Sequence, residues 1–67
     1  MDLRELRKAA HLTQQQLGEK ALVGQSAVAN WEAGLQMPLK KYWPLLAAAL
    51  NCTMETLEQA LKETVAG

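Results

Sequence analysis

The sequence predicts an all-α fold in which five short helices form one compact domain. No stretch of the 67-residue chain alternates apolar and polar residues with the period of two that is typical of strands. Apolar residues instead recur at helical spacing, and Thr, Gly, Asn and Pro stand where helices would begin or end. Hydrophobic residues make up 49% of the chain, enough to form a core in a domain near the lower size limit for folding without disulfides or metals.

The first two helices are expected over residues 2–10 and from about residue 14 to residue 21. Leu3, Leu6 and Ala10 share one face of the first helix. After a break at residues 11–12, the segment 13–16 (TQQQ) is a capping box, in which Thr13 accepts from the Gln16 amide and Gln16 reaches back. A short break at residues 22–24 (LVG) then separates the second helix from the third.

The third helix is expected from about Gln25 to Ala33, with Val28 and Trp31 as its inward pair and Gly34 as its terminating residue. Two short helices joined by about three residues have the layout of a helix-turn-helix, whose second helix enters the major groove of DNA. Two helices with a short turn are also common in proteins that bind no DNA.

The remaining chain predicts a loop and two more helices. Residues 35–43 (LQMPLKKYW) are expected to form the loop, because Pro38 lacks an amide donor and Pro44 disfavours the α conformation at Trp43. Pro44 suits the first position of a fourth helix ending at residue 50, and Asn51 suits a left-handed terminator. Thr53 is expected to cap a fifth helix, whose residues Met54, Leu57 and Leu61 form one stripe. The domain is therefore placed at residues 1–63 and a frayed tail at residues 64–67.

Composition favours a binding module over an enzyme. Seven basic and seven acidic residues balance, with net charges of +1, −1, +2 and −2 over residues 1–11, 12–34, 35–50 and 51–67. This balance alone does not indicate nucleic acid. The chain shows no Gly-rich phosphate loop, Ser/His/Asp set or paired catalytic carboxylates. His11 and Cys52 are the only residues of their types, so we expect no metal, no cofactor and no intramolecular disulfide.

The longest apolar run, residues 44–50, is too short to span a membrane, and the N-terminal segment does not resemble a signal peptide. We therefore expect no membrane partner and a reducing, cytoplasmic setting.

The outward face of the expected third helix carries the side chains suited to reading DNA. Four uncharged residues lie opposite Val28 and Trp31: Gln25, Ser26, Ala29 and Asn30. Gln and Asn can pair bidentately with adenine, Ser can donate or accept, and Ala can contact a thymine methyl group. An ordinary solvated helix face would have the same polarity, so this pattern alone leaves both interpretations open.

Most of the chain, residues 3–61, resembles the Cro/C1-type helix-turn-helix family of phage repressors and bacterial regulators. The matching elements are L-R-K at 6–8, L-T-Q-Q-Q-L at 12–17, Val23, Q-S-A-V-A-N-W-E-A-G at 25–34 and Pro38. The segment 43–57 (WPLLAAALNCTMETL) is similar to the later helices of that family. The resemblance implies a lambda repressor-like DNA-binding fold, a double-stranded DNA operator as partner, and a location in the bacterial cytoplasm or nucleoid.

The resemblance also implies roles for single residues. Base contacts are implied at three positions of the third helix: Gln25, Ser26 and Asn30. Phosphate contacts are implied at Gln14, Lys40 and Lys41. Gln14 matches a residue that also buttresses the recognition helix. Arg7 and Glu32 match a partly buried ion pair that ties the first helix to the third.

Three positions depart from the family pattern. Leu22 stands where Gly is usual, and it must adopt positive φ at a cost of about 1–2 kcal/mol unless the turn is rebuilt. Gly24 replaces a Ser or Thr and can cap the third helix only through its backbone. Gly18 replaces a usual Ala inside the second helix. Closer helix approach would explain Gly18, but we favour a slightly loose turn.

The sequence therefore predicts a transcriptional regulator, specifically a Cro-like repressor that binds a palindromic operator as a dimer. Apolar residues of the loop and the fifth helix are candidates for the dimer surface: Leu35, Met37, Leu39, and Leu57 or Leu61. The alternative is a protein-interaction module such as an antitoxin-like partner, which the neutral charge and the acidic fifth helix favour.

Overall fold

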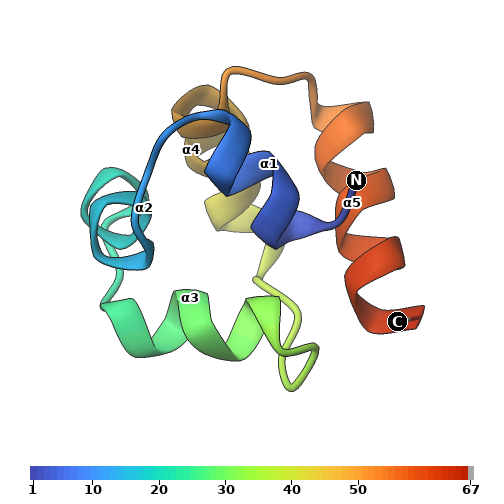
Figure 1. The fold of residues 1–67 in the computed structure, drawn as a ribbon, viewed down its shortest axis with the longest axis horizontal. Helices are drawn as coiled ribbons and strands as arrows, with labels where there is room; N and C mark the ends of the chain where they lie inside the picture. The colour runs from blue at the N-terminus through green and yellow to red at the C-terminus, as the bar shows by residue number, and fades with distance from the viewer. Residues whose placement is uncertain (67) are drawn as a thin grey trace.

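The computed structural model describes residues 1–66, and this part of the chain is helical without strands, as the sequence predicts. The elements are α1 (Leu3–Ala9), α2 (Gln14–Ala21), α3 (Gln25–Glu32), the short 3₁₀ helix η1 (Lys40–Tyr42), α4 (Trp43–Leu50) and α5 (Met54–Ala66). Figure 1 shows α3 along the lower edge of the molecule, with α2 and α5 on either side.

Side-chain caps fix where three of the helices begin. Thr13 and Gln16 form the expected capping box of α2, with N···O distances of 3.0 and 2.9 Å. Thr53 caps α5 by accepting from the Thr56 amide at 3.0 Å. Asp2 and Glu5 form a further capping box at the start of α1. Asp2 and Glu5 have the same three-residue spacing as Thr13 and Gln16, and this capping box was not predicted from the sequence.

Left-handed residues end the first four α-helices. Gly34 and Asn51 have φ values of 75° and 55°, as their sequence positions predict. Leu22 has a φ of 62°, so the turn is not rebuilt to avoid the left-handed conformation, and His11 adds an unpredicted case at 60°. At each of these residues the amide donates to the carbonyl three residues earlier, and the following amide donates to the carbonyl five residues before it. These paired bonds are the Schellman motif, which satisfies the last carbonyls of a helix.

The loop after α3 is shorter than expected, because Trp43 is helical. Its φ and ψ of −58° and −44° lie in the α region that Pro44 was expected to disfavour. The indole of Trp43 donates to the Pro38 carbonyl at 2.9 Å and its ring packs against the core. These tertiary contacts outweigh the local preference before proline, so η1 leads directly into α4.

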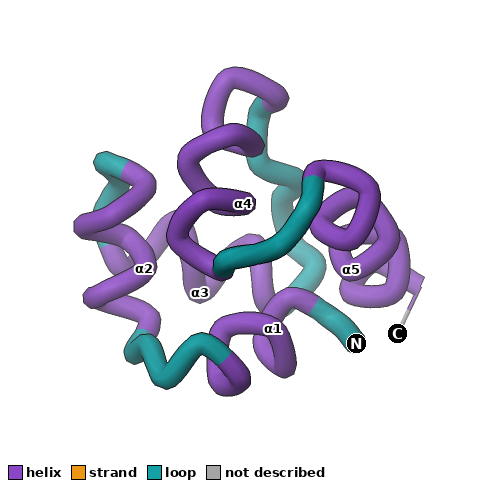
Figure 2. Tube along the Cα trace, turned by 90° about the horizontal axis from the view of Figure 1, so that it is seen from above, coloured by secondary structure: helices purple, strands orange, loops and turns teal. Residues whose placement is uncertain are grey.

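The core is built around α4, which lies between α2 and α5 in Figure 2. Twelve buried apolar residues form one cluster: Leu3, Leu6, Leu17, Ala21, Val28, Trp31, Leu46, Ala47, Leu50, Leu57, Ala60 and Leu61. The exposed fractions of Leu57 and Leu61 are 0% and 2%. The expectation that either residue belongs to a dimer surface is therefore wrong, because both are needed to close the core beneath α5.

The C-terminal helix is also longer than expected. α5 continues to Ala66, so residues 64–66 are helical where a frayed tail was predicted. Thr64 explains the difference, because its hydroxyl accepts from the Leu3 amide at 2.9 Å and donates to the Ala60 carbonyl at 2.8 Å. The last residue of the predicted tail, Gly67, lies outside the described residues. Within residues 1–66, no helix combines the length and apolar character needed to cross a membrane.

Candidate nucleic-acid interface

A close turn joins α2 to α3, and Gly18 is what permits it. A Cβ atom placed on Gly18 would lie 2.8 Å from the Val23 carbonyl oxygen and 3.2 Å from that of Gly24. The preference for a loose turn at Gly18 is therefore wrong, because the backbone of the turn packs directly on α2. Gly24 precedes α3 in extended conformation without a side-chain cap, as its sequence predicts.

One side of α3 is buried and the other faces solvent. Val28 and Trp31 are 0% and 5% exposed, and they hold α3 against the core. On the outward side, Gln25 and Ser26 are exposed, while Ala29 and Asn30 are half-buried. The four residues predicted to contact bases therefore share one accessible face of α3. None of them is charged.

An ion pair between Arg7 and Glu32 ties α3 to α1. Arg7 donates to Glu32 through Nε at 2.5 Å and through Nη2 at 3.2 Å, and its Nη1 donates to the Leu12 carbonyl at 2.7 Å. The side chains of Arg7 and Glu32 are 11% and 1% exposed. Removing either partner would strand a charge in a nearly dry environment. Arg4 approaches the same carboxylate at 3.6 Å from the solvent side.

Gln14 connects this ion pair to the outward face of α3. Its Nε2 donates to Oε1 of Glu32 at 3.1 Å, and its Oε1 accepts from Nε2 of Gln25 at 3.4 Å. The sequence did not predict the contact between Gln14 and Glu32, because these residues are separated by 18 positions and belong to different helices. The family resemblance implied that Gln14 buttresses the recognition helix, but it did not say which residues of α3 Gln14 contacts.

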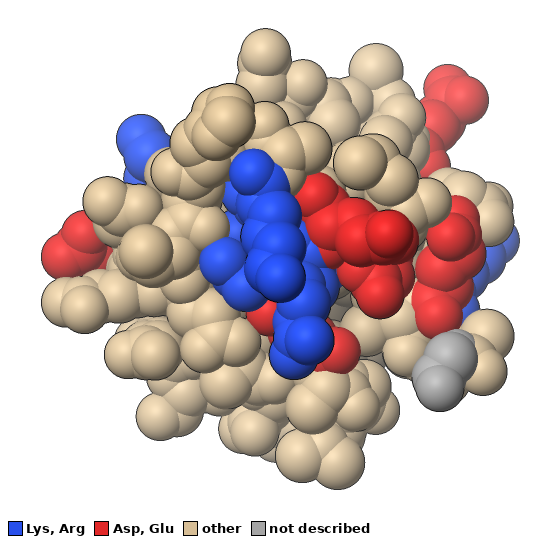
Figure 3. Space-filling model, in the orientation of Figure 1, with Lys and Arg blue, Asp and Glu red and all other residues tan. Residues whose placement is uncertain are grey.

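The two lysines predicted to contact phosphate belong to η1, a different element from those that carry this hydrogen-bonded group. Lys40 and Lys41 are exposed on η1, with their ammonium groups 6.0 and 5.2 Å from the rings of Trp43 and Tyr42. On the face seen in Figure 3, Lys and Arg side chains gather near the position of α1, beside a group of Asp and Glu. The basic side chains on that face are therefore bordered by acidic ones.

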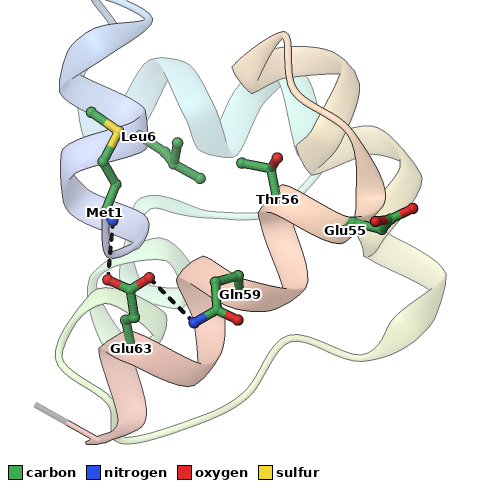
Figure 4. A pocket seen from close by; sticks show the side chains of 6 residues that line it. All are labelled: Met1, Leu6, Glu55, Thr56, Gln59 and Glu63. Carbon is green, nitrogen blue, oxygen red and sulfur yellow. Dashed lines mark hydrogen bonds and ion pairs between the residues drawn. The ribbon is translucent and has the colours of Figure 1, made fainter.

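A shallow pocket between α1 and α5 offers no comparable chemistry. Figure 4 shows three of the residues that line it contacting one another: the Met1 amino group lies 3.0 Å from Glu63, whose second oxygen accepts from Gln59 at 3.5 Å. The hydrogen bond that the Met1 amino group donates to Glu63 raises the pKa of that amino group. Burial raises the pKa of the Cys52 thiol, which disfavours the reactive thiolate. Among residues 1–66, no three potential metal ligands are grouped together.

The fold and the accessible face of α3 define a helix-turn-helix protein. The family model described as helix-turn-helix matches residues 3–57. The chain therefore belongs to the Cro/C1-type helix-turn-helix family, a family of DNA-binding regulators and not of enzymes. It is a transcriptional regulator that binds double-stranded DNA. No curated protein and no solved structure matches the chain.

Proposed function

We propose that the protein is a sequence-specific repressor of the phage Cro-like kind, which binds a palindromic operator as a homodimer. The observation that carries this proposal is the accessible, uncharged face of α3, whose leading residue Gln25 is held from behind by Gln14. Amide and hydroxyl groups match the hydrogen-bonding edges of bases, whereas contacts to phosphate orient a protein without reading sequence.

Base recognition is assigned to the outward face of α3. Gln25 reaches an adenine edge from the first turn, and Ser26 donates or accepts beside it. Ala29 and Asn30 lie one turn further along, where a thymine methyl group and a second adenine are suitable partners. The ion pair between Arg7 and Glu32 supports this role by fixing α3 to α1.

Phosphate contacts are assigned to Gln14, Lys40 and Lys41. Gln14 lies at the first position of α2, where an amide donor can reach the DNA backbone beside the recognition helix. The two lysines are exposed on η1 and have no acidic neighbour within the segment 35–50. Such contacts orient the protein on the duplex without reading its sequence.

The homodimer is assigned to the loop that follows α3. Leu35, Met37 and Leu39 are 74%, 46% and 63% exposed, an unusual concentration of apolar surface for a short loop. A dimer doubles the DNA contacts that a domain of this size can make.

Selection of binding sites from random duplex DNA tests the proposal. The expected sites are two-fold symmetric, with half-sites about one helical turn apart, roughly 10–11 bp. Recovery of asymmetric single half-sites would contradict the palindrome. A chain that selects no duplex sequence at moderate salt would instead support the antitoxin-like interaction module.

Two variants then separate base reading from phosphate binding. Gln25→Ala should remove the preference at one base pair in each half-site, because a bidentate pair contributes about 1–3 kcal/mol of discrimination. Gln14→Ala should weaken binding to every site, including operators that differ from one another outside the base pair that Gln25 reads, because a lost phosphate contact lowers affinity without regard to sequence. Binding is measured against operators that differ by single base pairs. If Gln25→Ala keeps every wild-type preference, the assignment of α3 as the reading helix is wrong.

A further inference from the structure

We propose that Glu32, the last residue of α3, whose side chain is buried, sets the direction of the Gln25 amide through Gln14 and thereby makes Gln25 select adenine over guanine. This inference rests on the proposed function of α3. It adds a positioning residue that contacts no base, and it concerns which atom of Gln25 faces the DNA.

The chain of hydrogen bonds begins at a group that can only accept. Glu32 is paired with the guanidinium of Arg7 through both carboxylate oxygens, and Arg4 approaches Oε1 as well. A carboxylate in this state has no proton to donate. The amide of Gln14 must therefore turn its Nε2 toward Glu32, which is the arrangement observed at 3.1 Å.

The direction of the second amide follows from the first. With its Nε2 committed to Glu32, Gln14 presents Oε1 toward α3. Gln25 must then turn its own Nε2 inward to donate to Gln14, as observed at 3.4 Å. Oε1 of Gln25 is left as the outward atom, an acceptor, while the second hydrogen on Nε2 remains available as a donor.

This direction matches one purine and not the other. Adenine presents a donor at N6 and an acceptor at N7, which complement Oε1 and Nε2 of Gln25. Guanine has the same N7 acceptor but an acceptor at O6, which would face Oε1 across a repulsive contact. A reversed Gln25 amide would place its NH₂ group outward and would suit guanine.

The hydrogen bonds from Gln25 to Gln14 and from Gln14 to Glu32 form a relay, and burial makes Glu32 its fixed end. Its side chain is 1% exposed, and Arg7 is itself anchored to the Leu12 carbonyl. Gln25 is exposed and would otherwise exchange between the two amide directions in water. The buried Arg7–Glu32 pair thus determines, through Gln14, which way the exposed amide of Gln25 is oriented.

Two variants interrupt the relay at different points. Gln14→Met removes the link and keeps the Arg7–Glu32 pair. The double variant Arg7→Met/Glu32→Met removes the reference without leaving a buried charge unpaired. Gln15→Met is the matched control, since Gln15 is exposed on the same turn of α2. Each is compared with wild type on operators carrying adenine or guanine at the base pair that Gln25→Ala identifies.

Wild type should favour adenine over guanine by about 5- to 100-fold at that base pair. Gln14→Met and the double variant should both reduce this ratio to within about threefold of unity, whereas Gln15→Met should keep it. Loss of a phosphate contact cannot produce this result, because it weakens both operators equally. If Gln14→Met and the double variant keep the wild-type ratio, the relay is overturned even though Gln25→Ala still identifies α3 as the reading helix.

A measurement without DNA separates the relay from the proposed function. In ¹⁵N-labelled full chain, the side-chain Nε2 resonance of Gln25 should shift in Gln14→Met and in the double variant but not in Gln15→Met. A Gln25 resonance that is unchanged in both relay variants would overturn the inference whether or not the protein selects a DNA sequence.

Discussion

Leu22 adopts the left-handed conformation although its side chain contributes little to packing. Its φ is 62° and its side chain is 78% exposed. A Cβ atom in this conformation costs about 1–2 kcal/mol, and glycine avoids the cost. Leu22→Gly should therefore raise the free energy of unfolding by about 1 kcal/mol, measured by urea denaturation.

The matched control for Leu22 is Leu39, which is also exposed but has a φ of −63°. Leu39→Gly should leave stability unchanged or lower it, because glycine there only adds freedom to the unfolded chain. If both glycine variants change stability in the same direction and by the same amount, conformational strain at Leu22 is not the cause.

The stability of the protein should also depend on two single residues, Arg7 and Glu32, which form a buried ion pair. Arg7→Met leaves a carboxylate that is 1% exposed, and Glu32→Met leaves a guanidinium that is 11% exposed. Each single variant should lower the free energy of unfolding by about 3 kcal/mol, whereas the double variant should cost much less than the sum. Thermal and denaturant unfolding of all four proteins gives the coupling energy. A coupling near zero would show that the pair does not act as a unit.

At the level of elements, the α2–α3 turn depends on Gly18. Alanine is favoured over glycine inside a helix by about 1 kcal/mol, so propensity alone predicts that Gly18→Ala is stabilising. The 2.8 Å approach to the Val23 oxygen predicts the opposite, because neither backbone segment can move without breaking the turn. We expect Gly18→Ala to lower the free energy of unfolding by about 1–2 kcal/mol.

Gly24 provides the control for Gly18 in the same turn. A Cβ atom on Gly24 would meet no heavy atom within 4 Å, and its φ of −79° suits any residue. Gly24→Ser adds the side-chain cap that α3 lacks and should raise stability by about 0.5–1 kcal/mol. Circular dichroism during denaturation measures both variants. Stabilisation by Gly18→Ala would instead support a loose turn.

A helix end could be predicted from the sequence where the residue that causes it acts on groups close to it in the chain. Thr13, Thr53, Gly34 and Asn51 act on groups within a few residues, so the sequence located these helix ends correctly. Trp43 was assigned to the loop because its helical state depends on packing and on a bond to Pro38.

The candidate face of α3 was likewise predictable from its own periodicity, but its link to the interior was not. Whether Gln14 contacts Glu32 depends on how closely α2 approaches α3, and Gly18 sets that distance through the turn. The same limit explains Leu57 and Leu61. A helical stripe predicts that one face is covered, but it does not say whether the same chain or a second copy covers it.

The exposed loop at residues 35–39 leads to a prediction for the whole molecule. If two copies pair through Leu35, Met37 and Leu39, a charge in this loop should oppose dimerisation without altering α3. Leu35→Glu should therefore weaken binding to a full palindromic operator by about 10-fold or more, because the second half-site no longer adds its contacts. Binding to an isolated half-site should weaken far less, since a single α3 still reads its own bases.

The control for Leu35→Glu must add the same charge at an exposed apolar residue outside the loop. Val65 on α5 is 56% exposed, so Val65→Glu changes the overall charge equally. Titrations of both variants against a full operator and a half-site separate loss of dimer contacts from general repulsion between the added charge and DNA. General repulsion lowers affinity for both DNA molecules in both variants. Equal losses for Leu35→Glu and Val65→Glu on the full operator would mean that the loop is not the dimer surface, and that two-fold binding requires contacts elsewhere on the domain.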